Sequence, residues 1–336
     1  MHRVQIDLIL FIPGAQKSGT TSLFVALCNH SQIQEPRHKE PHFFAQSRSV
    51  IEKNTDWYLE NIQREKKGVS VDASTAYMAD ERTPKILYEH FPEAKILILL
   101  RDPVRRAFSS YVHMQRKTPK YDYREFGEIM GRLENKSKTS LLERERQATR
   151  RARQQGLIRD YLTEDYHERK FGASFRSSFR DPEWAHRYFS YSQYSRIVNS
   201  YTSRFDNVKL VIFEELLQEP GAVLSEIAKF LGIDQRELRF PHAHESRVPS
   251  AIGRIYARMR EQGQHVAHTL NALRDGFDTL MKTIGAEQLA VKARRLLRRK
   301  PKLKEDQYMR ARSLLSTEYA YWRDRRPVTK KLWHFS

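Results

Sequence analysis

The fold of this chain is decided by the stretch Leu8-Ile9-Leu10-Phe11-Ile12-Pro13-Gly14-Ala15-Gln16-Lys17-Ser18-Gly19-Thr20-Thr21-Ser22-Leu23. Its first five residues are all apolar, as in a parallel strand that is covered on both faces. The turn that follows contains two glycines, and a helical apolar pattern starts near Thr20 or Thr21. A strand, a glycine-containing turn and a helix N-terminus in this order predict an anion site, because the first N–H groups of a helix have no partners within it.

Strands and helices alternate through most of the remaining sequence. This alternation predicts an α/β fold, P-loop-like and three-layered, with a mostly parallel central sheet flanked by helices. The clearest strand is the apolar run at 95–100. The predicted strands are 4–12, 68–72, 95–100 and 208–213, and the predicted helices after the first are 56–59, 84–91, 104–111, 188–205 and 221–231.

Two charged segments interrupt this pattern, and we expect both to be insertions within a single domain, 1–336. The segment 116–180 is rich in charge and poor in apolar residues, which predicts a charged insert of solvated helices. The segment 250–305 predicts a basic helical insert with a short heptad-like apolar seam between Val266 and Ile284. Within it, 286–304 is typical of a basic helix that either lies on an anionic membrane or solvates its outer face.

The charge and the cysteine content limit the partners and the compartment. A formal net charge of +19 indicates an anionic partner, which includes nucleotides, acidic glycans, anionic lipids and nucleic acids. Cys28 is the only cysteine, so the chain has no internal disulfide and a reducing compartment is expected. No window reaches the roughly 18 apolar residues that a membrane-spanning helix needs. We therefore expect a cytoplasmic protein, with peripheral membrane contact through 286–304 as the alternative.

The residues around the turn indicate which anion it binds. In a Walker A loop the lysine follows the second glycine, whereas here Lys17 precedes Gly19. A Walker B strand ends in an acid that holds magnesium, whereas the strand at 95–100 is followed by Arg101. These differences argue against a P-loop kinase or NTPase and predict a phosphate site with no metal.

Two motifs resemble those of the sulfotransferases that use 3′-phosphoadenosine 5′-phosphosulfate (PAPS). The segment 14–21 is similar to the motif that binds the 5′-phosphosulfate in that family, and 99–111 is similar to the motif that binds the 3′-phosphate. The segment 39–44, Lys-Glu-Pro-His-Phe-Phe, resembles the carbohydrate (heparan-type) branch and its bacterial cytosolic relatives. By this resemblance the donor-binding residues are Gly14, Gln16, Lys17, Ser18, Gly19, Thr20, Thr21, Arg101, Ser109 and, in a later loop, Arg247.

The resemblance also implies the catalytic residues. Lys17 would stabilise the bridging oxygen as PAP leaves, and Glu40 would take the proton of the acceptor. Burial beside the phenylalanines that follow would make Glu40 a stronger base. His42 is an alternative base, or it orients the acceptor. Structural alternatives stay open: Glu40 can pair with a neighbouring cation such as Lys39 or Arg37, Arg101 can pair with Asp102 or Glu93, and His42 can be a buried structural histidine.

The expected activity is transfer of the sulfuryl group of PAPS to a hydroxyl, less often an amine, of a carbohydrate or glycolipid, without a metal. One departure bears on the acceptor: the carbohydrate branch usually has a lysine where Ala73 stands. A sulfotransferase acting on a non-carbohydrate small molecule or lipid is the alternative. A basic nucleic-acid-binding protein is the alternative from another class, but the basic residues of 116–180 are mixed with acids. The basic run at 292–304 has no aromatic residue to stack on a base, so we expect no nucleic acid partner.

Overall fold

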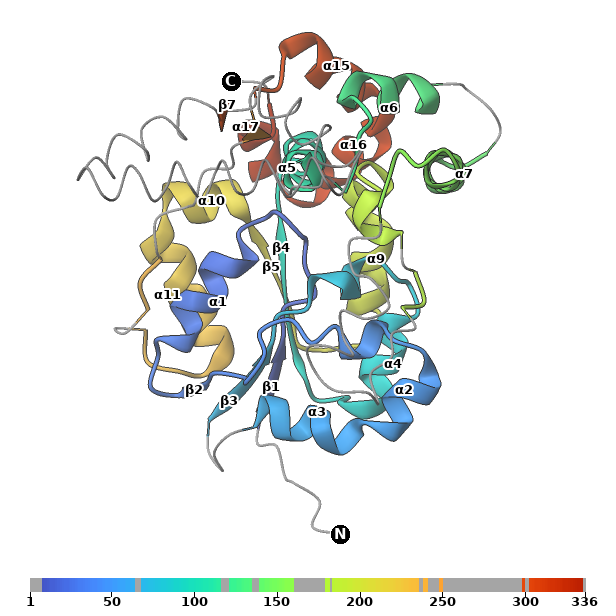
Figure 1. Cartoon of the computed structure of the whole chain (residues 1–336). Helices are drawn as coiled ribbons and strands as arrows, with labels where there is room; N and C mark the ends of the chain where they lie inside the picture. The colour runs from blue at the N-terminus through green and yellow to red at the C-terminus, as the bar shows by residue number, and fades with distance from the viewer. Residues whose placement is uncertain are drawn as a thin grey trace, which may run out of the picture.

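The structure is a computed structural model that describes residues 8–63, 68–115, 121–134, 139–159, 179–181, 183–235, 238–240, 248–249, 298–299 and 302–334. Its centre is a five-stranded, entirely parallel sheet in the order β2-β3-β1-β4-β5 (Figure 1). The sheet confirms the predicted α/β class. The strands are β1 Leu8–Phe11, β2 Ile33–Gln34, β3 Val69–Asp72, β4 Lys95–Leu100 and β5 Val208–Ile212.

Helices cover both faces of the sheet and its carboxyl end (Figure 1). The strands therefore lose solvent on both sides, which is why β4 is apolar at every position after Lys95. One face is covered by α1 Thr20–Cys28, α10 Phe213–Gln218 and α11 Pro220–Leu231, and the other by α2 Arg48–Lys53, α3 Thr55–Ile62, α4 Thr83–His90 and α9 Tyr194–Thr202. Towards the carboxyl end lie α5 Pro103–Gln115, α6 Phe126–Leu133, α7 Leu141–Gln154, α15 Glu305–Leu314, α16 Ser316–Arg325 and α17 Val328–Leu332.

Short elements connect these layers. In the described part of the chain four of them are 3₁₀ turns, and two residues at Val248–Pro249 (β6) pair antiparallel with Arg298–Arg299 (β7). The predicted helix 188–205 is wrong in its first part, because a 3₁₀ turn precedes α9 there. The strand β2, which follows α1, is absent from the predicted strands. The 3₁₀ turns are η1 Phe43–Ala45, η2 Thr75–Met78, η4 Trp184–His186 and η5 Ser190–Ser192.

The described part of the charged insert 116–180 contributes to the core, which corrects the expectation of core-poor, solvated helices. In α6 the apolar residues Phe126, Ile129, Met130 and Leu133 are buried in the same cluster as the sheet residues Ile96 and Ile98. Their spacing places them on one helix face, so the charged residues between them point elsewhere. The overall charge of the segment concealed this periodicity.

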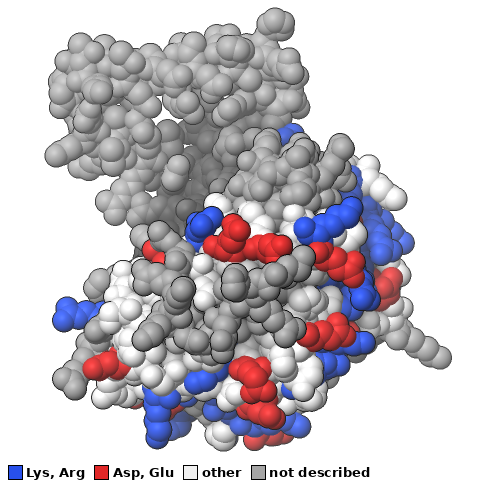
Figure 2. Space-filling view, turned by 90° about the horizontal axis from the view of Figure 1, so that it is seen from below, with Lys and Arg blue, Asp and Glu red and all other residues white. Residues whose placement is uncertain are grey.

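Most of the basic insert 250–305 lies outside the described residues, as do the heptad-like seam, most of 286–304 and Arg247. The single-domain prediction and the membrane-contact prediction therefore stay predictions. Among the described helices, none is both long and apolar enough to span a membrane. On the face of the molecule shown in Figure 2, the described Lys and Arg side chains are interspersed with Asp and Glu rather than gathered into one patch.

Candidate functional site

The loop between β1 and α1 lies where the sheet order changes direction. β1 has β3 on one side and β4 on the other, and in open parallel sheets ligands bind at the carboxyl ends of strands at such a point. The loop is anchored to β4 by two backbone bonds, from Ala15 N to Leu99 O at 2.7 Å and from Leu99 N to Gly14 O at 2.9 Å. A third bond, from Met78 N to Pro13 O at 3.1 Å, anchors it to η2 on the other side. The predicted PAPS-binding loop, residues 14–21 (the donor loop), is thus bonded to β4 on one side of β1 and to η2, which follows β3, on the other.

The end of the loop presents groups suited to an anion. Lys17 and Gly19 both adopt left-handed backbone angles, with φ of 71° and 86°, and Gly19 is the N-cap of α1. Such turns bring successive N–H groups towards one point. The hydroxyl of Ser18 is buried and has no hydrogen-bond partner among the described residues. A buried hydroxyl without a partner, next to a helix N-terminus, fits a phosphate or sulfate oxygen.

Arg101 connects the two predicted motifs. Its Nη1 donates to the carbonyl of Lys17 at 2.9 Å, and its guanidinium lies over the ring of Phe213, 5.2 Å from the centroid. Nε has no hydrogen-bond partner in the described part of the chain and lies 4.0 Å from Glu214 Oε1. Burial lowers the pKa of Arg101 and the carboxylate of Glu214 opposes that shift. The acid beside the guanidinium is thus Glu214, and neither of the partners considered from the sequence forms an ion pair with it.

The helix α5 carries Ser109, which is the remaining residue predicted to bind PAPS. Ser109 lies on this helix and is half-buried. The neighbouring Ser110 is buried, and its hydroxyl donates to Gln16 Oε1 at 3.0 Å. The side chain of Gln16 therefore holds the loop against α5.

Glu40 is brought to the donor loop by Lys39. Lys39 Nζ donates to Glu40 Oε1 at 3.1 Å and to Thr21 Oγ1 at 2.8 Å. The ion pair between Lys39 and Glu40, considered from the sequence as a structural alternative, is therefore present, and the same lysine reaches α1. Sequence reasoning missed this bridging role of Lys39. The side chain of Glu40 is 32% exposed, so the expected burial beside Phe43 and Phe44 is wrong, since both rings pack into the core instead.

His42 is buried next to Glu40. Its Nε2 lies 3.9 Å from Glu40 Oε2, and its ring lies 6.1 Å from the ring of Trp184. The backbone of His42 is left-handed, with φ of 50°, and its N–H donates to the hydroxyl of Ser74 at 3.0 Å. The structure thus places Glu40 beside His42, and Lys39 connects Glu40 to Thr21 at the start of α1, while the catalytic roles of Glu40 and His42 stay predictions.

The buried carboxylate of Asp72 stabilises the segment that contains Glu40 and His42. Asp72 at the end of β3 accepts from Tyr58 at 2.9 Å, from Tyr77 at 2.8 Å and from the backbone N–H of Ser74 at 3.0 Å. Burial raises the pKa of Asp72 to about 6, although its hydrogen bonds oppose the shift. Because Ser74 in turn binds His42, Asp72 fixes the segment that carries both candidate bases.

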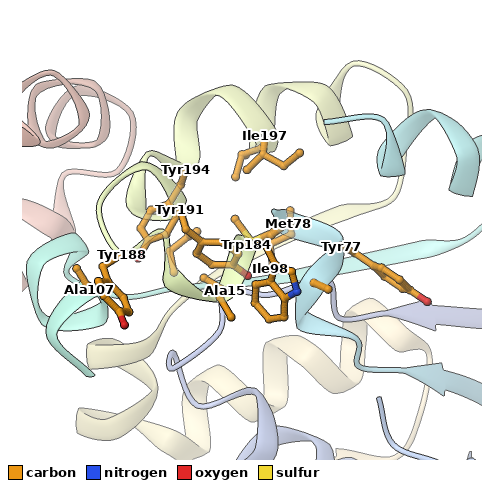
Figure 3. Packing of buried hydrophobic residues seen from close by; sticks show 14 of the residues in the cluster. Ala15, Tyr77, Met78, Ile98, Ala107, Trp184, Tyr188, Tyr191, Tyr194 and Ile197 are labelled. Carbon is orange, nitrogen blue, oxygen red and sulfur yellow. The ribbon is translucent and has the colours of Figure 1, made fainter. Parts of the chain in front are cut away.

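An aromatic group that sequence reasoning missed lies against the loop (Figure 3). The hydroxyl of Tyr191 accepts from Gln16 N at 3.2 Å and donates to Thr75 O at 2.6 Å. Burial raises the pKa of Tyr191 to about 12, so the hydroxyl keeps its proton near neutral pH. The aromatic residues between 184 and 194 are a sequence signal, but only the fold shows that they meet a loop near residue 16.

Two cavities lie apart from these residues. One of about 660 Å³ lies between α7, α9 and the turn after η2, and several of its arginines pair with acids that also line it, such as Arg180 with Asp80 and Arg196 with Glu81. The other, of about 370 Å³, lies between α15, α16 and α17. Neither of these two cavities is lined by a predicted site residue.

Relatives of this chain carry names that agree with the motifs. A 109-residue segment is 29% identical to human heparan sulfate glucosamine 3-O-sulfotransferase 6, covering 32% of this chain and 31% of the relative. It is 30% identical to mouse heparan sulfate glucosamine 3-O-sulfotransferase 3B1, covering 27% of that protein. The chain thus spans less than a third of the length of these relatives.

The chain also resembles a solved structure and matches a family model. The sulfotransferase of Alicyclobacillus acidocaldarius superposes with a TM-score of 0.45 and 24% identity, covering 79% of this chain and 94% of that one. The model of the sulfotransferase domain family matches residues 9–248, which include the donor loop, Glu40, His42, Arg101 and Ser109. Because that match extends over well more than half of its length, the chain belongs to the sulfotransferase domain family.

Proposed function

We propose that this protein transfers the sulfuryl group of PAPS to a hydroxyl of a carbohydrate or glycolipid acceptor. The observation that carries the proposal is the bond from Arg101 Nη1 to Lys17 O, which joins the two predicted PAPS-binding motifs at the carboxyl ends of β1 and β4. The buried Ser18 hydroxyl and the unpartnered Arg101 Nε fit the oxyanions at the two ends of such a donor. The names of the heparan sulfate relatives support a carbohydrate acceptor.

When bound, PAPS supplies a sulfuryl group whose bond to the phosphate oxygen breaks as the acceptor oxygen forms a new bond to sulfur. Lys17, with the N–H groups at the start of α1, neutralises the negative charge that develops on the leaving oxygen. Glu40 accepts the proton of the acceptor hydroxyl. Lys39 holds Glu40 beside Thr21, and so keeps the base next to the donor loop. Arg101 and Ser109 bind the 3′-phosphate and distinguish the donor from other nucleotides.

Nucleotide binding tests the donor part of the proposal. Isothermal calorimetry with PAP and with 5′-AMP, which lacks the 3′-phosphate, is expected to show about 10- to 100-fold tighter binding of PAP, the value of charge-assisted hydrogen bonds. Arg101→Lys keeps the charge but loses the planar fork, and should reduce that preference. Equal affinities of the unaltered protein for the two nucleotides would contradict the proposed donor.

A labelling experiment tests the acceptor part. The full chain is incubated with ³⁵S-labelled PAPS and fractions of polysaccharide, glycolipid and small molecules, with Glu40→Gln as the matched background. Label in the polysaccharide or glycolipid fraction, absent with the variant, is the expected result. Label confined to non-carbohydrate small molecules or lipids would replace the proposed acceptor class while leaving the donor intact.

A further inference from the structure

Asp102 determines how β4 passes into α5. Its Oδ1 accepts from the backbone N–H of Arg105 at 2.8 Å, the bond that an N-cap side chain makes to the third residue of a helix. Arg101 precedes Asp102 directly, and Ser109 lies two turns into the helix that Asp102 caps. A displacement of Asp102 therefore moves both proposed contacts to the 3′-phosphate.

Two tyrosines from the C-terminal helices bind the other oxygen of Asp102. Tyr308 on α15 and Tyr319 on α16 donate their hydroxyls to Oδ2 at 2.8 and 2.9 Å. Asp102 is fully buried, so these bonds compensate for the loss of water around its carboxylate. Burial raises the pKa of Tyr308 to about 12 and that of Tyr319 as well, so both hydroxyls remain donors at neutral pH.

The C-terminal segment reaches Asp102 by a second route. The backbone N–H of Asp102 donates to Glu214 Oε1 at 3.0 Å, and Glu214 Oε2 accepts from Trp333 Nε1 at 3.1 Å. Glu214 is also the acid beside Arg101. Arg312 fixes the backbone of Trp333 with a bond of 2.9 Å to its carbonyl. The side chain of Asp102 is thus bonded directly to α15 and α16, and its backbone N–H is connected to Trp333 through Glu214.

All of these C-terminal residues lie beyond residue 248, where the match to the family ends. We propose that Tyr308 and Tyr319 are positioning residues for the donor nucleotide: by holding Asp102, they set Arg101 and the start of α5 for recognition of the 3′-phosphate. The inference rests on the proposed use of PAPS. It adds that residues outside the family segment complete the donor site of this chain.

The test measures nucleotide preference in the full-length protein. Tyr308→Phe, Tyr319→Phe and the double variant remove only hydroxyls. Tyr321→Phe is the matched control, because it removes a hydroxyl on α16 that donates to Asn199 Oδ1. Calorimetry with PAP and 5′-AMP is combined with thermal unfolding. In the double variant PAP binding should weaken about tenfold while 5′-AMP binding changes less than about twofold, the loss of roughly one well-placed hydrogen bond. Tyr321→Phe should leave both affinities unchanged.

The outcomes separate this inference from the proposed function. An unchanged ratio of PAP to 5′-AMP affinity in the tyrosine variants, or an equal loss for both nucleotides, overturns the positioning role. If the double variant does not fold, the two single variants are compared in the same way. If the unaltered protein itself does not prefer PAP, the proposed donor is wrong, and the positioning role falls with it.

Discussion

The ring of Phe213 fills the space beside the α-carbon of Gly19: a β-carbon built on Gly19 would lie 2.6 Å from Cδ2 of that ring. Gly19 also has a φ of 86°, which side-chain-bearing residues rarely adopt. The same ring carries the guanidinium of Arg101 on its face. The aromatic side chain at the first position of α10 therefore requires a glycine in the donor loop and supports Arg101, which joins the two donor motifs.

Gly19→Ala should destabilise the protein and weaken PAP binding. The methyl group overlaps the Phe213 ring and the backbone becomes strained, which together cost about 2–4 kcal/mol in the free energy of unfolding. Urea denaturation measures that loss. The control is Gly127→Ala on α6, where no atom lies within 4 Å of an added β-carbon, and which should be neutral or stabilise by up to about 1 kcal/mol. Equal stability of the two variants would contradict the constraint.

Adding Phe213→Ala to Gly19→Ala separates the overlap from the strain. The double variant removes the overlap and keeps the left-handed backbone. We expect it to be more stable than the sum of the two single effects by about 1–2 kcal/mol, because neighbouring residues couple by such amounts. Urea denaturation of the four proteins gives this coupling energy. A coupling near zero would mean that backbone strain alone requires the glycine.

Lys17→Met should reduce turnover much more than donor binding. If Lys17 neutralises charge that forms only as the leaving oxygen departs, its removal lowers kcat about 10²–10³-fold. PAP affinity, measured by calorimetry, should fall less than about tenfold. Lys85→Met is the control, because Lys85 is exposed on α4 and pairs with Glu89. A loss of PAP affinity as large as the loss of kcat would make Lys17 a ground-state contact only.

The fold was predictable where a residue pattern is local. The apolar run of β4 gave its bounds directly, and the order of strand, turn and helix around Gly14 gave the donor loop. What was not predictable depends on residues far apart in the sequence. The residues around Asp102 do not indicate that its carboxylate binds two tyrosines more than 200 positions later. The residues around Gly19 likewise do not indicate its contact with Phe213.

The same difference between local patterns and long-range contacts applies to the candidate bases, Glu40 and His42. The segment that carries Glu40 and His42 could be identified from its residues, but its geometry could not. The salt bridge of Lys39 to Glu40 is between neighbours, whereas the bond of Lys39 to Thr21 depends on how the chain returns to α1. The predicted burial of Glu40 is wrong because Phe43 and Phe44, although close to it in sequence, pack into the core and not against its carboxylate.

Asp72 should make stability depend on pH. Its pKa is about 6 in the folded protein and near 3.8 in the unfolded chain, so between these values the folded state binds more protons. Stability from this group is therefore fully present below about pH 4 and is lost as the pH rises through 6, by roughly 3 kcal/mol. Asp72→Asn lacks this loss. As the pH rises over this range, the free energy of unfolding of the unaltered protein should therefore fall relative to that of Asp72→Asn.

The measurement is urea denaturation at several pH values from 4 to 7. Asp206→Asn serves as the control, because Asp206 is exposed and its replacement should leave the pH profile unchanged. A difference between Asp72→Asn and the unaltered protein that is flat across this range would show that Asp72 is already ionised in the fold at pH 4.

Glu40→Gln should abolish most of the transfer activity without changing donor binding. Glutamine keeps the shape of the side chain but cannot accept the acceptor proton, and loss of a general base costs about 10²–10⁴-fold in kcat. Glu35→Gln is the matched control, since Glu35 is an exposed acid on the same segment. PAP affinity, measured by calorimetry, should be the same in all three proteins.

His42 is the competing base, and substitutions of each residue in turn can distinguish the two. Glu40 Oε2 and His42 Nε2 lie 3.9 Å apart, so an acceptor hydroxyl near one lies near the other. If Glu40 is the base, His42→Gln lowers kcat less than Glu40→Gln does, and the pH–rate profile of His42→Gln keeps its acidic limb. If Glu40→Gln retains full activity and His42→Gln does not, the histidine takes the proton. In that case the role of Glu40 is confined to its contacts with Lys39 and His42.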